Sequence, residues 1–99
     1  MALRIIWSQT AGEDLREIAY YIARDNQKAA VQPANRIFHY IESASELPYS
    51  NRMVPEKADQ TIREIILKPY RIIYSIDNDR NTLHVLRIWH GCRGEPQVS

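Results

Sequence analysis

TIREIILKPYRIIYSIDNDRNTLHVLRIW, residues 61–89, is the stretch of sequence that decides the fold. It contains three runs rich in isoleucine, valine and tyrosine: Thr61–Leu67, Tyr70–Ile76 and Thr82–Trp89. Lys68-Pro69 separates the first two runs, and the polar residues 77–81 separate the second from the third. β-Branched and aromatic runs bounded by proline, asparagine and aspartate are typical of strands joined by turns. Because short turns make neighbouring strands antiparallel, the stretch predicts an antiparallel sheet.

A further strand and two helices are expected upstream of this sheet. The strand is Leu3–Trp7, and the first helix begins at either Ser8 or Thr10, both of which are good N-cap residues. Its apolar residues recur at helical spacing, as do those of a second helix. The two stripes are Leu15, Ile18, Ala19 and Ile22, followed by Ala30, Ala34, Ile37, Phe38, Ile41 and Ala44. Pro33 either lies in the first turn of the second helix or kinks a longer one.

The expected order is β-α-α-β-β-β, which defines an α+β domain. The helical hairpin should pack on one face of a small, mostly antiparallel sheet of about four strands. Residues 49–60 are expected to form a loop, and residues 91–99 an irregular tail of a single domain spanning residues 1–99. The other face of the sheet is left open with isoleucine and tyrosine side chains, which predicts that a partner binds there.

Composition excludes several classes of protein. The chain has 99 residues, of which 44% are hydrophobic, and its 13 Lys+Arg nearly balance 12 Asp+Glu. A net charge of +1 argues against a general nucleic-acid binder. One cysteine allows no internal disulfide, and no signal-peptide layout or long apolar run is present, so we expect a cytoplasmic protein without a membrane anchor. Three scattered glycines exclude a phosphate-binding loop, and no cofactor is expected.

The candidate functional residues lie mainly on the predicted strands. Arg71 and Arg87 can approach each other across neighbouring strands, and the planar guanidinium suits phosphate or carboxylate. The alternative is a solvated strand face on which Glu64 and Asp77 neutralise the arginines. The acidic residues of the first helix, such as Asp14 and Glu17, are expected on its solvated side.

His84, His90 and Cys92 are too few for a structural zinc site, so no metal is expected. His90 remains a candidate acid or base, with a structural role as its alternative. Trp89 is expected to pack at the sheet margin or to join a contact surface.

Three segments, read together, resemble ParE-type toxins of the ParE/RelE superfamily from type II toxin–antitoxin modules. They are Trp7-Ser8 with Asp14-Leu15-x-x-Ile18 and Tyr21-Ile22-Ala23; Ile62-Arg63-Glu64 with Tyr70–Tyr74; and Val85–Arg93. The resemblance implies a bacterial toxin neutralised by a cognate antitoxin in a hetero-oligomer. It also implies that contact with operator DNA is made only through the antitoxin.

The resemblance implies two alternative actions. ParE-like members inhibit DNA gyrase, whereas RelE-like members cut messenger RNA on the ribosome with basic residues on the sheet and a tyrosine near the C-terminus. Arg71 matches the strand arginine of both branches, and Arg93 lies close to a basic residue of the ribonuclease branch. Glu64, however, stands where that branch tends to have a lysine, and no tyrosine follows Arg93. Gyrase inhibition without a catalytic residue is therefore favoured.

Two alternatives remain beside gyrase inhibition. One is a metal-independent ribonuclease, for which the catalytic candidates are Arg71, Arg87, His90 and Arg93. The other is a family member that binds its antitoxin but has little toxicity. For every reading, the candidates for contact with the target or the antitoxin are Arg63, Tyr70, Arg71, Arg87, Trp89, His90 and Arg93.

Overall fold

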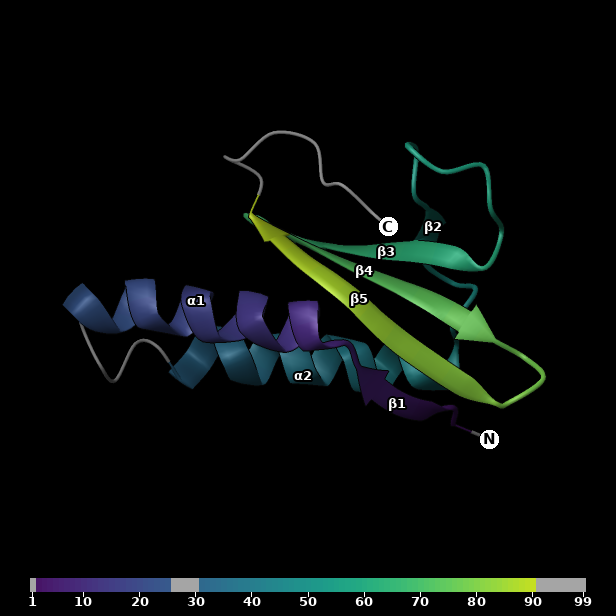
Figure 1. Ribbon diagram of the computed structural model, residues 1–99, viewed down its shortest axis with the longest axis horizontal. Coiled ribbons are helices and arrows are strands. Elements are labelled where there is room, and N and C mark those ends of the chain that lie inside the picture. Colours follow the sequence, from purple (N-terminus) through teal and green to yellow (C-terminus); the bar gives the residue numbers. More distant parts are fainter. Residues whose placement is uncertain (1, 26–30, 91–99) are drawn as a thin grey trace.

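The computed structural model describes residues 2–25 and 31–90 of the chain (Figure 1). The elements are β1 (Arg4–Trp7), α1 (Gln9–Asp25), α2 (Val31–Glu46), β2 (Arg52–Met53), β3 (Ile62–Leu67), β4 (Tyr70–Asp77) and β5 (Thr82–His90). The expected α+β class and the order of the predicted elements are confirmed. The predicted tail at residues 91–99 and the residue Arg93 lie outside the described part of the chain.

The sheet has five strands in the order β1-β5-β4-β3-β2. The β1 strand runs parallel to β5, and the other neighbours are antiparallel, so the sheet is mostly antiparallel as expected. The expectation of about four strands missed β2, which lies inside the stretch predicted to be a loop. Its two residues, Arg52 and Met53, are too few to show alternation in the sequence.

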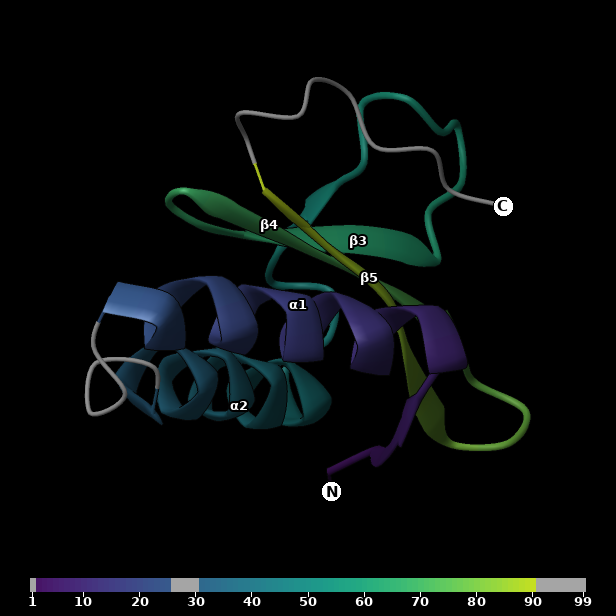
Figure 2. The same cartoon turned by 60° about the vertical axis from the view of Figure 1, so that its left-hand side comes forward.

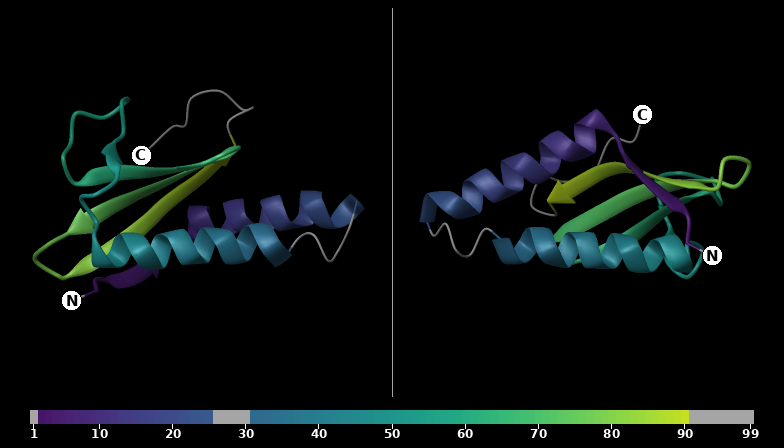
Figure 3. Two further views of the ribbon diagram at one scale, coloured as in Figure 1. Left: turned by 180° about the vertical axis from the view of Figure 1, so that it is seen from behind. Right: turned by 90° about the horizontal axis from the view of Figure 1, so that it is seen from below.

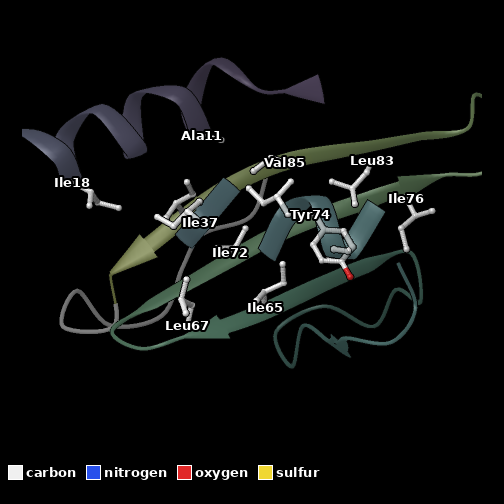
Figure 4. Close-up of a cluster of buried hydrophobic side chains, with 13 residues drawn as sticks. Ala11, Ile18, Ile37, Ile65, Leu67, Ile72, Tyr74, Ile76, Leu83 and Val85 are labelled. Atoms are coloured by element: carbon white, nitrogen blue, oxygen red, sulfur yellow. The ribbon is translucent and has the colours of Figure 1, made fainter. Parts of the chain in front are cut away.

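Both helices pack on one face of the sheet, as Figures 1 and 2 show. The hairpin that they form extends beyond the end of the sheet (Figure 3). Between the helices and the sheet lies one apolar core, shown in Figure 4. Its buried members are Ala11, Ile18, Ile37, Ile41, Ala44, Ile65, Leu67, Ile72, Tyr74, Ile76, Leu83, Val85 and Ile88. The alternating residues of β4 in this list show which face of each strand the helices cover.

Ser8 is the residue that starts α1, which settles the choice between the two predicted starts. Its Oγ accepts a hydrogen bond from the backbone N–H of Ala11 at 3.0 Å, the usual N-cap interaction. The same hydroxyl donates to the backbone oxygen of Leu86 at 2.9 Å. Ser8 therefore caps the helix and ties it to β5. At the second helix, Pro33 lies in the first turn, where its missing N–H costs little.

Replacing Ser8 with alanine should lower the free energy of unfolding by about 1.5 kcal/mol, because a cap and a second hydrogen bond are lost together. Urea unfolding followed by circular dichroism measures the change. Ser43→Ala is the matched control, since this exposed serine only donates to the backbone oxygen of His39 within α2. A loss for Ser8→Ala no larger than that of the control would contradict the double role of Ser8.

Candidate functional site

The face of the sheet turned away from the helices is called the outer face here. Strand register places its residues in cross-strand rows at the end of the sheet where β5 finishes. One row contains Ile66, Arg71 and Trp89; the next contains Glu64, Ile73 and Arg87. Two of the four candidate arginines, Arg71 and Arg87, and the candidate aromatic residue Trp89 are thus brought together on one surface.

Arg71 is held by two glutamates. Its Nη1 and Nη2 donate to the two carboxylate oxygens of Glu56 at 2.9 and 3.0 Å. Its Nε donates to Glu64 Oε2 at 2.8 Å, and Nη2 makes a second, short bond to the same oxygen. The hydrogen bonds to Glu56, followed by those to Glu64, raise the pKa of Arg71 above its usual value. All three nitrogens of the guanidinium are therefore engaged by carboxylates.

Glu64 is the centre of this network. Its side chain has 0% exposure, and its Oε1 accepts a hydrogen bond from Arg52 Nε at 2.5 Å. Two arginines and two glutamates, namely Arg52, Arg71, Glu56 and Glu64, thus make a group with no formal net charge. A phosphate approaching Arg71 would have to displace a bidentate carboxylate. The neutralising role expected of Glu64 is confirmed. Asp77 pairs with Arg80 instead of Arg71 or Arg87, with 3.9 Å between Asp77 Oδ2 and Arg80 Nε.

Arg87 pairs with a different carboxylate. Its Nε donates to Asp14 Oδ2 at 2.9 Å and its Nη2 to Asp14 Oδ1 at 3.3 Å. The guanidinium carbon lies 4.8 Å from the ring centroid of Trp89, which is a cation–π arrangement. Asp14 is 8% exposed, so the expectation that it lies on a solvated helix side was wrong. Arg71 lies opposite Trp89 and Arg87 opposite Ile73, so the two arginines are diagonal neighbours on adjacent strands and not direct cross-strand partners.

The outer face is less open than the sequence suggested. Ile73 is fully buried, and so is Val54 from the segment after β2. The tyrosines of the predicted strands, Tyr70 and Tyr74, alternate onto the helix side and pack in or against the core, so they do not supply the tyrosine side chains expected on the open face. Ile66, with 44% exposure, is the large apolar side chain that the outer face presents beside Arg71.

Tyr70 and His90 are neighbours on the helix side of the sheet. They are cross-strand partners, and their rings pack edge to face with centroids 5.5 Å apart. Burial raises the pKa of Tyr70. The sequence grouped these two residues with Arg71 and Trp89, but strand alternation puts the two pairs on opposite faces.

Arg63 lies at another part of the sheet and ties β3 to the loop before β2. Its Nε donates to the backbone oxygen of Gln60 at 2.8 Å, and its Nη1 to that of Asn51 at 3.0 Å. Its guanidinium carbon also lies 5.0 Å from the ring centroid of Tyr49. These contacts give Arg63 a structural role, and the register pairs it with Tyr74, away from Arg71 and Arg87.

Besides Arg52, which binds Glu64, three residues were missed as members of the site. Asp14 and Glu56 hold the arginines, and Ile66 adds the exposed apolar group. For Ile66, the alternation with the inward-facing Ile65 and Leu67 was a usable signal. No such signal marks Asp14 or Glu56, because neither lies on the same strand as the arginine that it binds or on a strand next to it.

Neither a metal site nor a membrane span emerges from the described ranges. Residues 2–25 and 31–90 contain no group of three or more His, Cys, Asp or Glu side chains arranged to hold an ion. Within the same ranges, each helix is too short or too polar to cross a bilayer.

The Glu56–Arg71 pair predicts a pH dependence of stability. The hydrogen bond from Arg71 lowers the pKa of Glu56 below its ordinary value of 4.5. A carboxylate with a lowered pKa in the folded state contributes stability above its unfolded pKa and loses it as the pH falls through the folded pKa. The difference in free energy of unfolding between wild type and Glu56→Gln should therefore be present at pH 7 and disappear on acidification below pH 4.5.

Urea unfolding of both proteins from pH 7 downward measures this difference. Glu46→Gln, a change to an exposed glutamate at the end of α2, is the matched control for removing one acidic group. Parallel stability curves for wild type and Glu56→Gln across the whole range would show that the ion pair contributes nothing.

Three solved structures of proteins from toxin–antitoxin systems share this fold. The toxin–antitoxin system ParDE of P. aeruginosa contains a chain that superposes with a TM-score of 0.72 at 16% identity, covering 90% of this chain and 96% of that one. A chain of the RelBE2 toxin–antitoxin complex from Mycobacterium tuberculosis gives 0.60 at 21% identity, covering 91% and 99%. A double mutant of the E. coli toxin RelE in the free state gives a TM-score of 0.61 at 15% identity, covering 95% of this chain and 88% of that one. The chain therefore shares its fold with these chains of the ParDE and RelBE2 systems and with RelE.

Sequence comparison gives the family. Residues 5–93 match the family model described as "ParE toxin of type II toxin-antitoxin system, parDE". A curated protein named "Putative toxin Y4kP" from Sinorhizobium fredii is 35% identical over 97 residues, which cover 96% of this chain and 95% of that protein. The chain therefore belongs to the ParE toxin family of type II toxin–antitoxin systems, as the resemblance in its sequence implied.

Proposed function

We propose that this toxin acts by binding a protein target, DNA gyrase, and that it does so without cutting RNA. The observation that carries the proposal is that the two candidate arginines of the outer face pair with carboxylates of the chain itself. Arg71 is bound by Glu56 and Glu64, and Arg87 by Asp14. A face on which positive and negative groups balance is suited to binding the surface of another protein.

Ribonuclease chemistry makes different demands on the same face. A nuclease without a metal needs positive groups aimed at the phosphate where charge develops, and a group that transfers a proton. Arg71 would have to leave two carboxylates before it could supply such charge. His90, the candidate for proton transfer, lies on the helix side of the sheet beside Tyr70. The arrangement therefore favours contact over catalysis.

The surface proposed for target contact is the group Ile66, Arg71, Arg87 and Trp89 on the outer face. Tryptophan and arginine are enriched among the residues that dominate binding energy at protein interfaces. Arg87 stacks on Trp89, and Ile66 adds exposed apolar area in the same cross-strand row as Arg71 and Trp89. This group combines apolar, aromatic and charge-balanced features that a protein partner can cover.

A cognate antitoxin is proposed as the second partner, acting in the cytoplasm and carrying any contact with operator DNA. Toxins of this family pair with antitoxins, and the neighbouring ParDE and RelBE2 structures come from such systems. Co-expression of the chain with the product of the adjacent small reading frame tests the pairing. A stable complex on size exclusion, with growth restored, is expected; a toxin that stays monomeric and lethal would contradict it.

The gyrase target is tested with purified protein and relaxed plasmid. Wild-type toxin should inhibit supercoiling by gyrase and cause linear DNA to accumulate. A toxin that leaves gyrase unaffected and produces codon-phased cuts in ribosome-bound messenger would establish the ribonuclease alternative instead. Absence of both effects would indicate a family member that has kept antitoxin binding and lost toxicity.

A further inference from the structure

Within residues 2–25 and 31–90, no strand lies beside the last part of β5 on the α1 side. The β1 strand pairs only with Thr82–Val85, whereas β5 continues to His90. The start of α1 takes over from there: Ser8 N–H donates to Val85 O at 2.9 Å, and the Ser8 hydroxyl donates to Leu86 O. Asp14 follows, and its Oδ2 accepts the backbone N–H of Ile88 at 3.0 Å. A side chain of α1 thus replaces the missing strand.

Asp14 also binds the side chain next to that backbone group. The same Oδ2 accepts from Arg87 Nε at 2.9 Å, and Oδ1 accepts from Arg87 Nη2. One nearly buried carboxylate therefore fixes both the strand edge at Ile88 and the guanidinium of Arg87. Since Arg87 in turn lies over the ring of Trp89, the position of the stacked pair depends on Asp14.

We infer that Asp14 is a positioning residue that holds the Arg87–Trp89 stack in the orientation that binds the target. The inference rests on the proposed function, because it assigns these two residues to target contact. Ordering a long side chain before association reduces the entropy that binding would otherwise cost. Because Asp14 binds its guanidinium, Arg87 is pre-organised in this sense. Asp14 therefore contributes to target binding although it does not itself line the contact surface.

Asp14→Asn is the decisive variant, because asparagine keeps the size and an oxygen acceptor for Ile88 N–H while removing the charge that holds Arg87. Glu13→Gln is the matched control, since Glu13 is the exposed neighbouring acid on the same helix. The gyrase inhibition of Asp14→Asn should be about tenfold weaker than that of wild type, and Glu13→Gln should match wild type. The double variant Asp14→Asn/Arg87→Gln should be no weaker than Arg87→Gln alone, because the two residues act as one unit.

Trp89 fluorescence supplies a readout that does not need the target. In a Trp7→Phe background, Asp14→Asn should shift Trp89 emission to longer wavelength and increase its quenching by acrylamide, because Arg87 no longer stays over the ring. Circular dichroism at a temperature where all variants are folded ensures that potency is compared between folded proteins. If Asp14 had only a structural role, Asp14→Asn would lower thermal stability and leave both the potency and the Trp89 emission of the folded protein unchanged.

The two readouts separate failure of the inference from failure of the proposed function. If wild type inhibits gyrase and the folded Asp14→Asn variant is equally potent, the positioning role is wrong. If wild type has no effect on gyrase, the proposed target is wrong, and the emission of Trp89 alone decides whether Asp14 positions the stack. Unchanged emission and quenching in Asp14→Asn would then overturn the inference.

Discussion

Replacing Glu64 with alanine should lower the free energy of unfolding by about 3 kcal/mol, the loss typical of breaking a buried ion pair from one side. The carboxylate has no exposure and accepts hydrogen bonds from Arg52 and Arg71. Its removal leaves Arg71, which is only 18% exposed, with Glu56 as its remaining carboxylate. Urea unfolding at pH 7 measures the change.

Two further variants make the result on Glu64 interpretable. Glu46→Ala removes an exposed glutamate at the end of α2 and should stay within about 0.5 kcal/mol of wild type. Glu64→Gln keeps the shape and removes the charge, so it should lie between wild type and Glu64→Ala. A loss for Glu64→Ala that is as small as that of Glu46→Ala would mean that the network on the outer face does not stabilise the fold.

Replacing Trp89 with alanine should weaken gyrase inhibition by about 100-fold, because a stacked tryptophan at the centre of an interface is among the most costly residues to remove. Supercoiling assays over a range of toxin concentrations measure the loss, and circular dichroism verifies the fold. Arg80→Ala is the matched control. Arg80 is a highly exposed residue in the turn between β4 and β5, at the opposite end of β5 from Trp89.

The outcome for Trp89→Ala separates two locations for the contact surface. Loss of inhibition with an intact fold supports the outer face as the site of contact. Full inhibition by Trp89→Ala, together with loss in the folded Arg80→Ala variant, would move the contact to the turn between β4 and β5. Either result is informative, because Trp89 and Arg80 lie at opposite ends of the hairpin that β4 and β5 form.

The sequence predicted the fold well because most elements have a local signal. Runs of β-branched and aromatic residues bounded by turns identified the strands, helical spacing identified the hairpin, and Ser8 carried the N-cap chemistry that the structure uses. The β2 strand was missed because Arg52–Met53 is held by pairing with β3, and two residues have no period. Local sequence patterns also do not predict that β1 pairs with β5, because this pairing joins the two ends of the described chain.

The functional surface was predicted less completely, because its chemistry depends on partners distant in sequence. Arg71 and Arg87 were identified as candidates, but the acids that neutralise them come from other elements. Asp14 is 73 residues from Arg87, and Glu56 is 15 from Arg71. Only Glu64, on the neighbouring strand, was in reach of reasoning about cross-strand pairs. Successive residues of a strand point to opposite faces of the sheet. This rule alone could have shown that Tyr70 and His90 lie on the face opposite to Arg71 and Trp89.

A reaction that contains both possible targets decides whether the toxin acts on a protein or on RNA. Purified toxin is added to a translation extract that also contains gyrase and relaxed plasmid, and plasmid topology and messenger integrity are read from the same sample. We expect supercoiling to stop and linear plasmid to accumulate while the messenger stays intact. Codon-phased cuts in the messenger with supercoiling unaffected would contradict this expectation.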